Sequence, residues 1–296
     1  MTDVHSLFRR FEANLRMSPS TVESVRLRYR TITRRLNMDF WGINSDTQHS
    51  RYAGSYGRGT AISTSDIDIL VELPSDVYET YWMQTLLGSN GPSRLLQRVK
   101  ESLQQTYPTT KLRGDGQVIV VEFSDGVKFE VVPVFSDGYQ TLAYPDTHNG
   151  GSWQHMKPEL ESRAFAELSS AKPGGLKKFC RMLRAWNIKS DLQLPGQAID
   201  AMAYEYWLTS ENADKDPFLY FDWHTRDFFA YWVSEFNRNG WIEAPGSRRR
   251  IDVRFNRTEL ELLKIYADAS RSAARTDNPD AVSTWRLIYG DKFPES

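Results

Sequence analysis

Residues 54–73 read GSYGRGTAISTSDIDILVEL, a glycine-rich turn that leads into an apolar run, and Pro74 ends that run. The apolar run predicts a buried β-strand. Gly54, Gly57 and Gly59 allow the backbone to turn tightly and to approach a ligand closely. Exposed backbone N–H groups in this turn, together with the hydroxyl of Ser55, predict a cradle that binds phosphate.

Two aspartates follow the turn at the start of the predicted strand. Asp66 and Asp68 are two residues apart, so their side chains project from the same face of a strand. Adjacent carboxylates repel one another unless a cation neutralises them, and Mg²⁺ prefers oxygen ligands. Solvated aspartates at a sheet edge are the alternative, but the spacing of the two motifs favours a phosphoryl- or nucleotidyl-transfer site.

A third carboxylate is expected on a neighbouring hairpin. Residues 117–123 and 127–135 are rich in Val and Phe, and the Asp125-Gly126 pair between them is typical of a tight turn. Glu130 lies between apolar residues, where a carboxylate is costly unless it is paired or bound to a metal. Glu122 is the competing candidate, and the pattern favours Glu130.

A basic helix is predicted over residues 176–189. Lys177, Arg181 and Arg184 fall on one polar face, and residues 172–189 contain six basic residues and no acidic one. A solvated helix face is the ordinary explanation of such a run. Beside a metal site, however, the same charges are the expected complement that binds a triphosphate. Cys180 falls in the apolar stripe of this helix, which indicates a core residue.

The remaining patterns predict two lobes, residues 1–150 and 151–296. The first is mixed α/β, with a helical segment over 7–37 that Ser18-Pro19-Ser20 interrupts, and Ser20 is the predicted cap of the part that follows. A helix is also expected over 91–106, a turn at 113–116 and a loop-rich stretch over 136–175. The second lobe is mostly helical. Its predicted helices cover residues 176–189, 197–209, 225–238, 257–274 and 279–289.

Composition excludes several classes of protein. The 296 residues carry a formal charge of −1, which argues against a sequence-independent nucleic-acid binder and a polybasic membrane-surface protein. There is no long apolar run, and the first eight residues lack the apolar core of a signal peptide. A single cysteine excludes an internal disulfide and a zinc ribbon, and it suggests a reducing, cytoplasmic compartment.

With these residues identified, the chain resembles the CD-NTases, bacterial enzymes related to cyclic GMP-AMP synthase and oligoadenylate synthase within the polymerase-beta-like nucleotidyltransferases. The stretches from Gly54 to Thr60 and from Ser65 to Asp68 are similar to the family's phosphate-cradle and metal motifs. Glu130-Val131-Val132-Pro133 resembles the strand with the third acid, although the family most often has aspartate there. Arg181 to Asn187 resembles the basic helix, and Ala281 to Pro294 resembles the C-terminal helix and tail of bacterial members.

The resemblance implies an α+β, bilobal fold in which a mixed-sheet lobe with an N-terminal spine helix joins a helical C-terminal lobe. It implies that Asp66, Asp68 and Glu130 bind two Mg²⁺ ions (Mn²⁺ being an alternative) and that Gly54, Ser55, Lys177 and Arg181 bind nucleotide. NTPs, with ATP as one of them, would be condensed to a cyclic oligonucleotide with release of pyrophosphate.

The implied product is a second messenger of antiphage (CBASS) defence that a separate effector protein reads, with no membrane partner and no obligatory DNA activator. The alternatives are synthesis of linear oligoadenylate, nucleotidyl transfer to a small molecule, protein or RNA end, and a non-catalytic nucleotide-binding relative.

Overall fold

The structure is a computed structural model that describes residues 3–172, 175–190, 192–235, 240–275 and 278–295. The chain divides into two units. We call residues 17–57 and 64–159 the sheet unit, and residues 1–16, 58–63 and 160–296 the helical unit. The predicted fold class, a mixed-sheet part together with a helical part, is confirmed.

The sheet unit is built on a mixed sheet whose main path has the order β1-β2-β5-β4-β3, with β6 and β7 added beyond β5. Strands β2 and β5 are parallel, and the other pairs are antiparallel. The strands are β1 (Ser50–Tyr52), β2 (Ile67–Glu72), β3 (Lys111–Asp115), β4 (Val118–Glu122), β5 (Lys128–Ser136), β6 (Leu142–Asp146) and β7 (Ser152–Met156). The helices are α2 (Pro19–Leu36), α3 (Gly54–Arg58), α4 (Ser75–Leu86) and α5 (Gly91–Thr106), with a π-helical turn at Asn37–Trp41 and a 3-10 turn at His148–Gly150.

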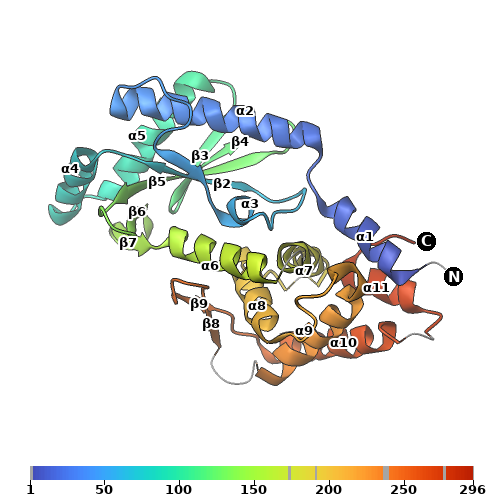
Figure 1. Ribbon diagram of the computed structural model, residues 1–296. Coiled ribbons are helices and arrows are strands. Elements are labelled where there is room, and N and C mark those ends of the chain that lie inside the picture. The colour runs from blue at the N-terminus through green and yellow to red at the C-terminus, as the bar shows by residue number, and fades with distance from the viewer. Residues whose placement is uncertain (1–2, 173–174, 191, 236–239, 276–277, 296) are drawn as a thin grey trace. The chain divides into compact units, whose positions relative to one another are not determined.

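One face of this sheet is covered by α2 and α5 (Figure 1). Alternate residues of β2 and β5 enter the core under these helices; they are Ile67, Ile69, Val71, Phe129, Val131 and Phe135. Because side chains alternate across a strand, the intervening residues, including Asp68 and Glu130, lie on the opposite face. The hydrophobic pattern therefore determines which face carries the carboxylates.

The helical unit contains α1 (Val4–Leu15), α6 (Pro158–Ala171), α7 (Leu176–Ser190), α8 (Gly196–Thr209), α9 (Phe221–Glu235), α10 (Arg257–Ala273) and α11 (Ala281–Tyr289), with a 3-10 turn at Pro217–Leu219 and a hairpin of β8 (Trp241–Glu243) and β9 (Arg250–Asp252). Its core is aromatic, and Cys180 is fully buried in it as predicted. Residues 236–238 of the predicted helix 225–238 and residues 173–174 of the expected loop lie outside the described part of the chain.

The division into units differs from the predicted lobes, residues 1–150 and 151–296, in three places. Helix α1 belongs to the helical unit because its apolar stripe, including Phe8 and Phe11, enters the aromatic core of that unit. Residues 58–63 belong there too, and Ile62 is buried in the same core. Residues 151–159 belong to the sheet unit, where β7 pairs with β6.

Several local predictions were wrong. The expected turn at 113–116 is mostly strand β3, the loop-rich stretch 136–175 contains β6, β7 and α6, and helix α4 was not predicted. The predicted cap of α2, Ser20, is also wrong, because the Ser18 side chain accepts from the backbone N–H of Thr21 and the helix begins at Pro19. Proline at the first helical position has no N–H to lose and a favourable φ, so the start shifts by two residues.

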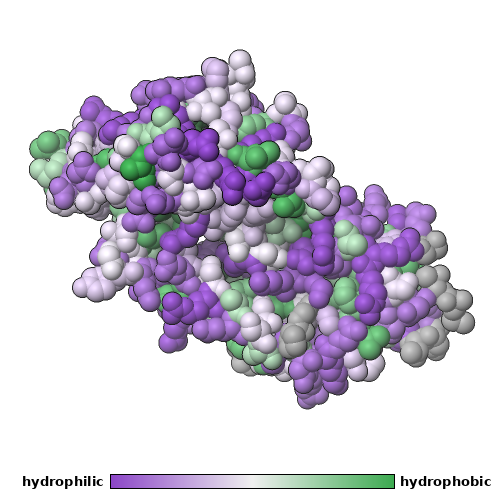
Figure 2. Space-filling model, turned by 45° about the horizontal axis from the view of Figure 1, so that its top comes forward, coloured by the Kyte–Doolittle hydropathy of each residue, from purple (hydrophilic) through white to green (hydrophobic). Residues whose placement is uncertain are grey.

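The side of the molecule that Figure 2 shows is mostly hydrophilic, with apolar residues scattered over it. A larger apolar group lies at the end of α4, where Trp82, Met83, Leu86 and Leu87 are all at least 40% exposed. Within the ranges that the structure describes, we find no helix whose length and apolar character would let it cross a membrane.

Acidification should destabilise the protein through one buried histidine. His224 on α9 is 1% exposed, and its Nδ1 lies 3.1 Å from the hydroxyl of Tyr206. Burial lowers the pKa of His224 to about 4 from an unperturbed 6.5. Below pH 6.5 the unfolded chain therefore takes up a proton that the folded chain does not, so stability present above pH 6.5 is lost as the pH falls towards 4. The loss is about 2–3 kcal/mol by pH 4.5.

Urea unfolding at pH 7 and pH 4.5 measures this loss, and His224→Gln provides the comparison. Glutamine retains hydrogen-bonding atoms but does not titrate in this range, so the variant should lose about 2 kcal/mol less than the wild type between the two pH values. An equal loss in both proteins would assign the pH dependence to other groups.

Candidate active site

The glycine-rich turn lies directly beside β2. Strands β1 and β2 are antiparallel, and the Ala53 N–H donates to the carbonyl of Asp68 at 2.8 Å. Helix α3 begins at Gly54, whose φ is +53°, in the left-handed region that favours glycine. A β-carbon added at Gly54 would overlap Oδ2 of Asp68. The absence of a side chain at position 54 therefore allows the turn and the carboxylate to lie in contact.

Ser55 is 7% exposed within this turn. It is the second residue of α3, and backbone N–H groups in the first turn of a helix have no acceptor four residues earlier within that helix. Gly57 is closed in as well, because a β-carbon there would lie 2.8 Å from the carbonyl oxygen of Tyr52. The Gly57 N–H donates to the carbonyl of Ala53 at 2.8 Å, so the predicted cradle is limited to the backbone at the start of α3.

Asp68 and Glu130 are direct neighbours across the parallel β2–β5 ladder. Asp66 precedes β2 by one residue and has the same strand parity as Asp68. Burial, together with the charges of Asp68 and Asp66 and a hydrogen bond with Asp68, raises the pKa of Glu130 to about 7. The three carboxylates thus form one electrostatic group that resists carrying three negative charges.

Glu122 has different surroundings. It lies on the same face of the sheet, opposite Lys128 in the β4–β5 register, and Lys111 Nζ is 2.9 Å from its Oε2. The hydrogen bond from Lys111 lowers the pKa of Glu122, whose side chain is 34% exposed. The structure therefore brings Glu130, and not Glu122, next to Asp68.

The carboxylate group suits a hard divalent cation. Its donors are all oxygen atoms, and burial together with the charges of Asp68 and Asp66 raises the pKa of Glu130, so a bound cation would relieve the repulsion among these groups. As the side chains stand, no three His, Cys, Asp or Glu residues among the described ones form a ready-made metal-ligand cluster.

The predicted cationic residues lie on α7, in the helical unit. Lys177 and Arg181, with Ser169, Ser170 and Lys178, line a surface pocket of about 410 Å³. The guanidinium of Arg181 donates to the Gly59 carbonyl at 2.6 Å and from Nε to Oε1 of Glu12 at 3.0 Å. Lys177 passes close to Gly59, since its Cδ would lie 3.5 Å from a β-carbon there. The α7 cations therefore contact the segment that follows the predicted cradle.

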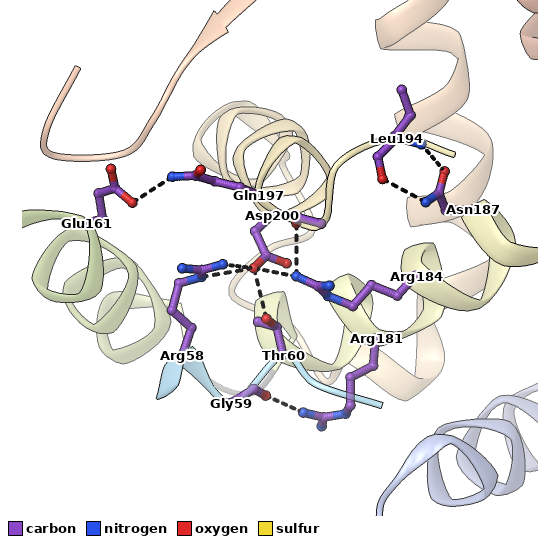
Figure 3. Close-up of polar contacts among 11 residues, drawn as sticks. Arg58, Gly59, Thr60, Glu161, Arg181, Arg184, Asn187, Leu194, Gln197 and Asp200 are labelled. Atoms are coloured by element: carbon purple, nitrogen blue, oxygen red, sulfur yellow. Dashed lines mark hydrogen bonds and ion pairs between the residues drawn. The ribbon is translucent and has the colours of Figure 1, made fainter. Parts of the chain in front are cut away.

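A buried ionic cluster in the helical unit was not predicted (Figure 3). Asp200 on α8 accepts hydrogen bonds from Arg58, Thr60 and Arg184. The sequence contains one signal for it, a single aspartate within the otherwise apolar run 198–203. An aspartate at that position requires partners, but the sequence does not identify them.

Comparison with known proteins identifies the family. The model of the SMODS family, the Second Messenger Oligonucleotide or Dinucleotide Synthetase domain, matches residues 1–168. The chain belongs to this family. It is thus a nucleotidyltransferase of the CD-NTase type, one of the enzymes that make cyclic oligonucleotide second messengers from NTPs.

Relatives and solved structures agree with this assignment. The chain is 24% identical over 257 residues to a cyclic AMP-AMP-AMP synthase of Acinetobacter sp., an alignment that covers 84% of this chain and 73% of that protein. CdnC of E. coli MS115-1, solved in complex with HORMA-deltaN, has a TM-score of 0.71 at 15% identity, covering 98% of both chains. DncV of Vibrio cholerae with the linear intermediate pppA(3′,5′)pG also has a TM-score of 0.71, at 13% identity over 99% and 96% of the chains. These structures confirm the predicted polymerase-beta-like fold.

Proposed function

We propose that this SMODS enzyme joins NTPs, with ATP as one of them, into a cyclic oligonucleotide at a site built from Asp66, Asp68 and Glu130. The observation that carries the proposal is the position of Gly54 against Asp68, with Glu130 as the direct cross-strand neighbour of Asp68. A phosphate in the cradle therefore lies beside the carboxylate group.

The three carboxylates are the proposed ligands of Mg²⁺, or of Mn²⁺ in its place. Bound there, two such ions would offset the carboxylate charges, polarise the α-phosphate and stabilise the leaving pyrophosphate. The side chains of Asp66, Asp68 and Glu130 are expected to rotate towards a shared cation, since their mutual repulsion then disappears.

The chain's own groups bind and orient the donor nucleotide. Ser55 and the backbone N–H groups at the start of α3 hold the triphosphate. Lys177 and Arg181 supply positive charge for its β- and γ-phosphates, and the contact of Arg181 with Gly59 also fixes the backbone that follows the cradle.

The reaction is an in-line displacement at the α-phosphorus. A ribose hydroxyl oxygen of the acceptor forms a bond to that phosphorus, the bond to the β-phosphate oxygen breaks, and pyrophosphate leaves with both bonding electrons. The hydroxyl proton passes to the ionised carboxylate of Glu130, a form that a bound divalent cation would favour. A second transfer of the same kind closes the ring.

ATP is the proposed substrate because the Acinetobacter relative is named a cyclic AMP-AMP-AMP synthase. The product is proposed to act in the cytoplasm as an antiphage signal that a separate effector protein binds.

Incubation of the protein with all four labelled NTPs and Mg²⁺ or Mn²⁺, followed by mass spectrometry of the products, tests this function. We expect pyrophosphate together with an oligonucleotide that resists phosphatase. A phosphatase-sensitive product would indicate linear oligoadenylate, and label attached to an added small molecule, protein or RNA end would indicate another acceptor. No turnover under any of these conditions contradicts the proposal.

A further inference from the structure

The segment of residues 58–63, which we call the anchored segment, connects the cradle to the aspartates. It begins three residues after Ser55 and ends three residues before Asp66, and both of these residues belong to the sheet unit. The anchored segment itself belongs to the helical unit. The anchored segment is therefore the direct chain connection between the cradle and the aspartates.

The main contact of the anchored segment is with Asp200. Oδ2 of Asp200 accepts from Arg58 Nε at 2.9 Å and from Thr60 Oγ1 at 2.9 Å. It also lies 2.8 Å from NH2 of Arg58 and accepts from NH2 of Arg184 at 2.8 Å (Figure 3). One carboxylate oxygen thus binds both ends of the Arg58–Thr60 stretch.

Burial makes these contacts strongly dependent on one another. Asp200 is 2% exposed and Thr60 is fully buried, and the side chains of Arg58 and Arg184 are each 12% exposed. Burial acts to raise the pKa of Asp200, but the two guanidiniums outweigh it and hold that pKa below its usual value. A charged pair in such surroundings cannot lose one member without leaving the other buried and uncompensated.

Further hydrogen bonds hold the anchored segment and its partner Arg184 within the helical unit. Arg184 also donates to the Gly196 carbonyl at 2.9 Å, which ties α7 to the start of α8. Arg181 donates to the Gly59 carbonyl, and the Ser63 N–H donates to the carbonyl of Leu15 at 2.9 Å. The position of Arg58 and Thr60 is therefore imposed by the helical unit.

We infer that Asp200 is a positioning residue, which fixes the backbone of the nucleotide-binding cradle by holding Arg58 and Thr60. The inference rests on the proposed role of Gly54 and Ser55 in binding the triphosphate. Arg58 is the last residue of α3, so displacement of its backbone displaces the short helix that contains both of these residues. Small displacements of a positioned reactant have large effects on rate and affinity.

The test compares two substitutions of Thr60 and one of Arg58. Thr60→Val has nearly the same shape but cannot donate to Asp200, whereas Thr60→Ser keeps the hydroxyl. Arg58→Lys keeps the charge but loses the two-nitrogen contact. We expect Thr60→Val and Arg58→Lys to raise KM for ATP about tenfold with kcat within about threefold, because binding of the triphosphate weakens in both the ground and transition states. Thr60→Ser should stay close to the wild type.

Glu161→Gln is the matched control. Glu161 on α6 is also a buried carboxylate of the helical unit, and it accepts from Gln197 on α8 at 2.8 Å and from Ser247 at 2.8 Å. Neither partner belongs to the anchored segment. We expect this variant to lower Tm to a degree similar to Thr60→Val while KM for ATP remains that of the wild type.

Amide hydrogen exchange of residues 54–63 gives a readout that does not depend on turnover. We expect faster exchange there in Thr60→Val and Arg58→Lys than in Glu161→Gln at equal Tm. Equal exchange and equal KM in Thr60→Val and Glu161→Gln would overturn the inference and leave the cluster with a general stabilising role. Failure of the proposed function is recognised separately, because the wild type would then make no oligonucleotide. The comparison of amide exchange between Thr60→Val and Glu161→Gln would still test whether Asp200 holds the cradle.

Discussion

Replacing Asp66 and Asp68 together by asparagine should abolish oligonucleotide synthesis, with kcat lower by at least about 1,000-fold. Asparagine is similar in size to aspartate, so the strand and its packing are retained, but both negative charges are lost. The remaining carboxylate, Glu130, cannot by itself hold two divalent cations. Pyrophosphate release and mass spectrometry of the products measure the effect.

A thermal-shift experiment separates this loss from misfolding. Without divalent cation, the double variant should melt no lower than the wild type, because the substitution removes repulsion around Glu130. With Mg²⁺ the wild type should gain stability by mass action and the variant should not. Undiminished synthesis in the double variant would remove these aspartates from the site.

Glu130→Gln and Glu122→Gln provide the matched pair for the third carboxylate. Both residues lie on the same face of the sheet, in β5 and β4, but only Glu130 is next to Asp68. We expect Glu130→Gln to lower kcat about 100-fold or more, since it removes the proposed metal ligand and proton acceptor. Glu122→Gln should stay within about twofold, as exposed ion pairs contribute little. The reverse order of effects would exchange the roles of the two glutamates.

The part of the site that was predictable from sequence is the part whose geometry is local. Asp66 and Asp68 share a face because a strand repeats every two residues, and the glycine pattern places a tight turn before them. The choice between Glu130 and Glu122 needed the register of β5 against β2 and β4, which the two strand patterns alone do not determine.

The parts that were not predictable depend on distant contacts. Asp200 is 140 residues from Thr60, and Arg181 is 169 residues from Glu12, so no local pattern joins them. Helix α4 and strands β6 and β7 carry weaker signals, because their apolar residues are interrupted by polar ones, and β6 also contains Pro145. The allocation of α1 and residues 58–63 to the helical unit likewise depends on packing that their composition does not reveal.

Gly54→Ala should be the most damaging single-methyl substitution in the cradle. The left-handed backbone at φ +53° costs alanine about 1 kcal/mol, and the added β-carbon would overlap Oδ2 of Asp68. Either the turn or the carboxylate must move, and both belong to the proposed site. We expect kcat/KM for ATP to fall about 100-fold or more, since small displacements of positioned groups have effects of this size.

Gly42→Ala is the control for a general loss of stability. Gly42 lies in the same unit with φ +68°, and a β-carbon there would have no atom within 4 Å. This variant should lose about 1 kcal/mol of unfolding free energy and keep its kcat/KM. If urea unfolding gives both variants a similar loss while only Gly54→Ala loses activity, the changed geometry of the turn beside Asp68, and not lower stability, is responsible. Equal activity in the two variants would mean that the cradle can relax away from Asp68 without consequence, and the proposed phosphate site would then not depend on their close approach.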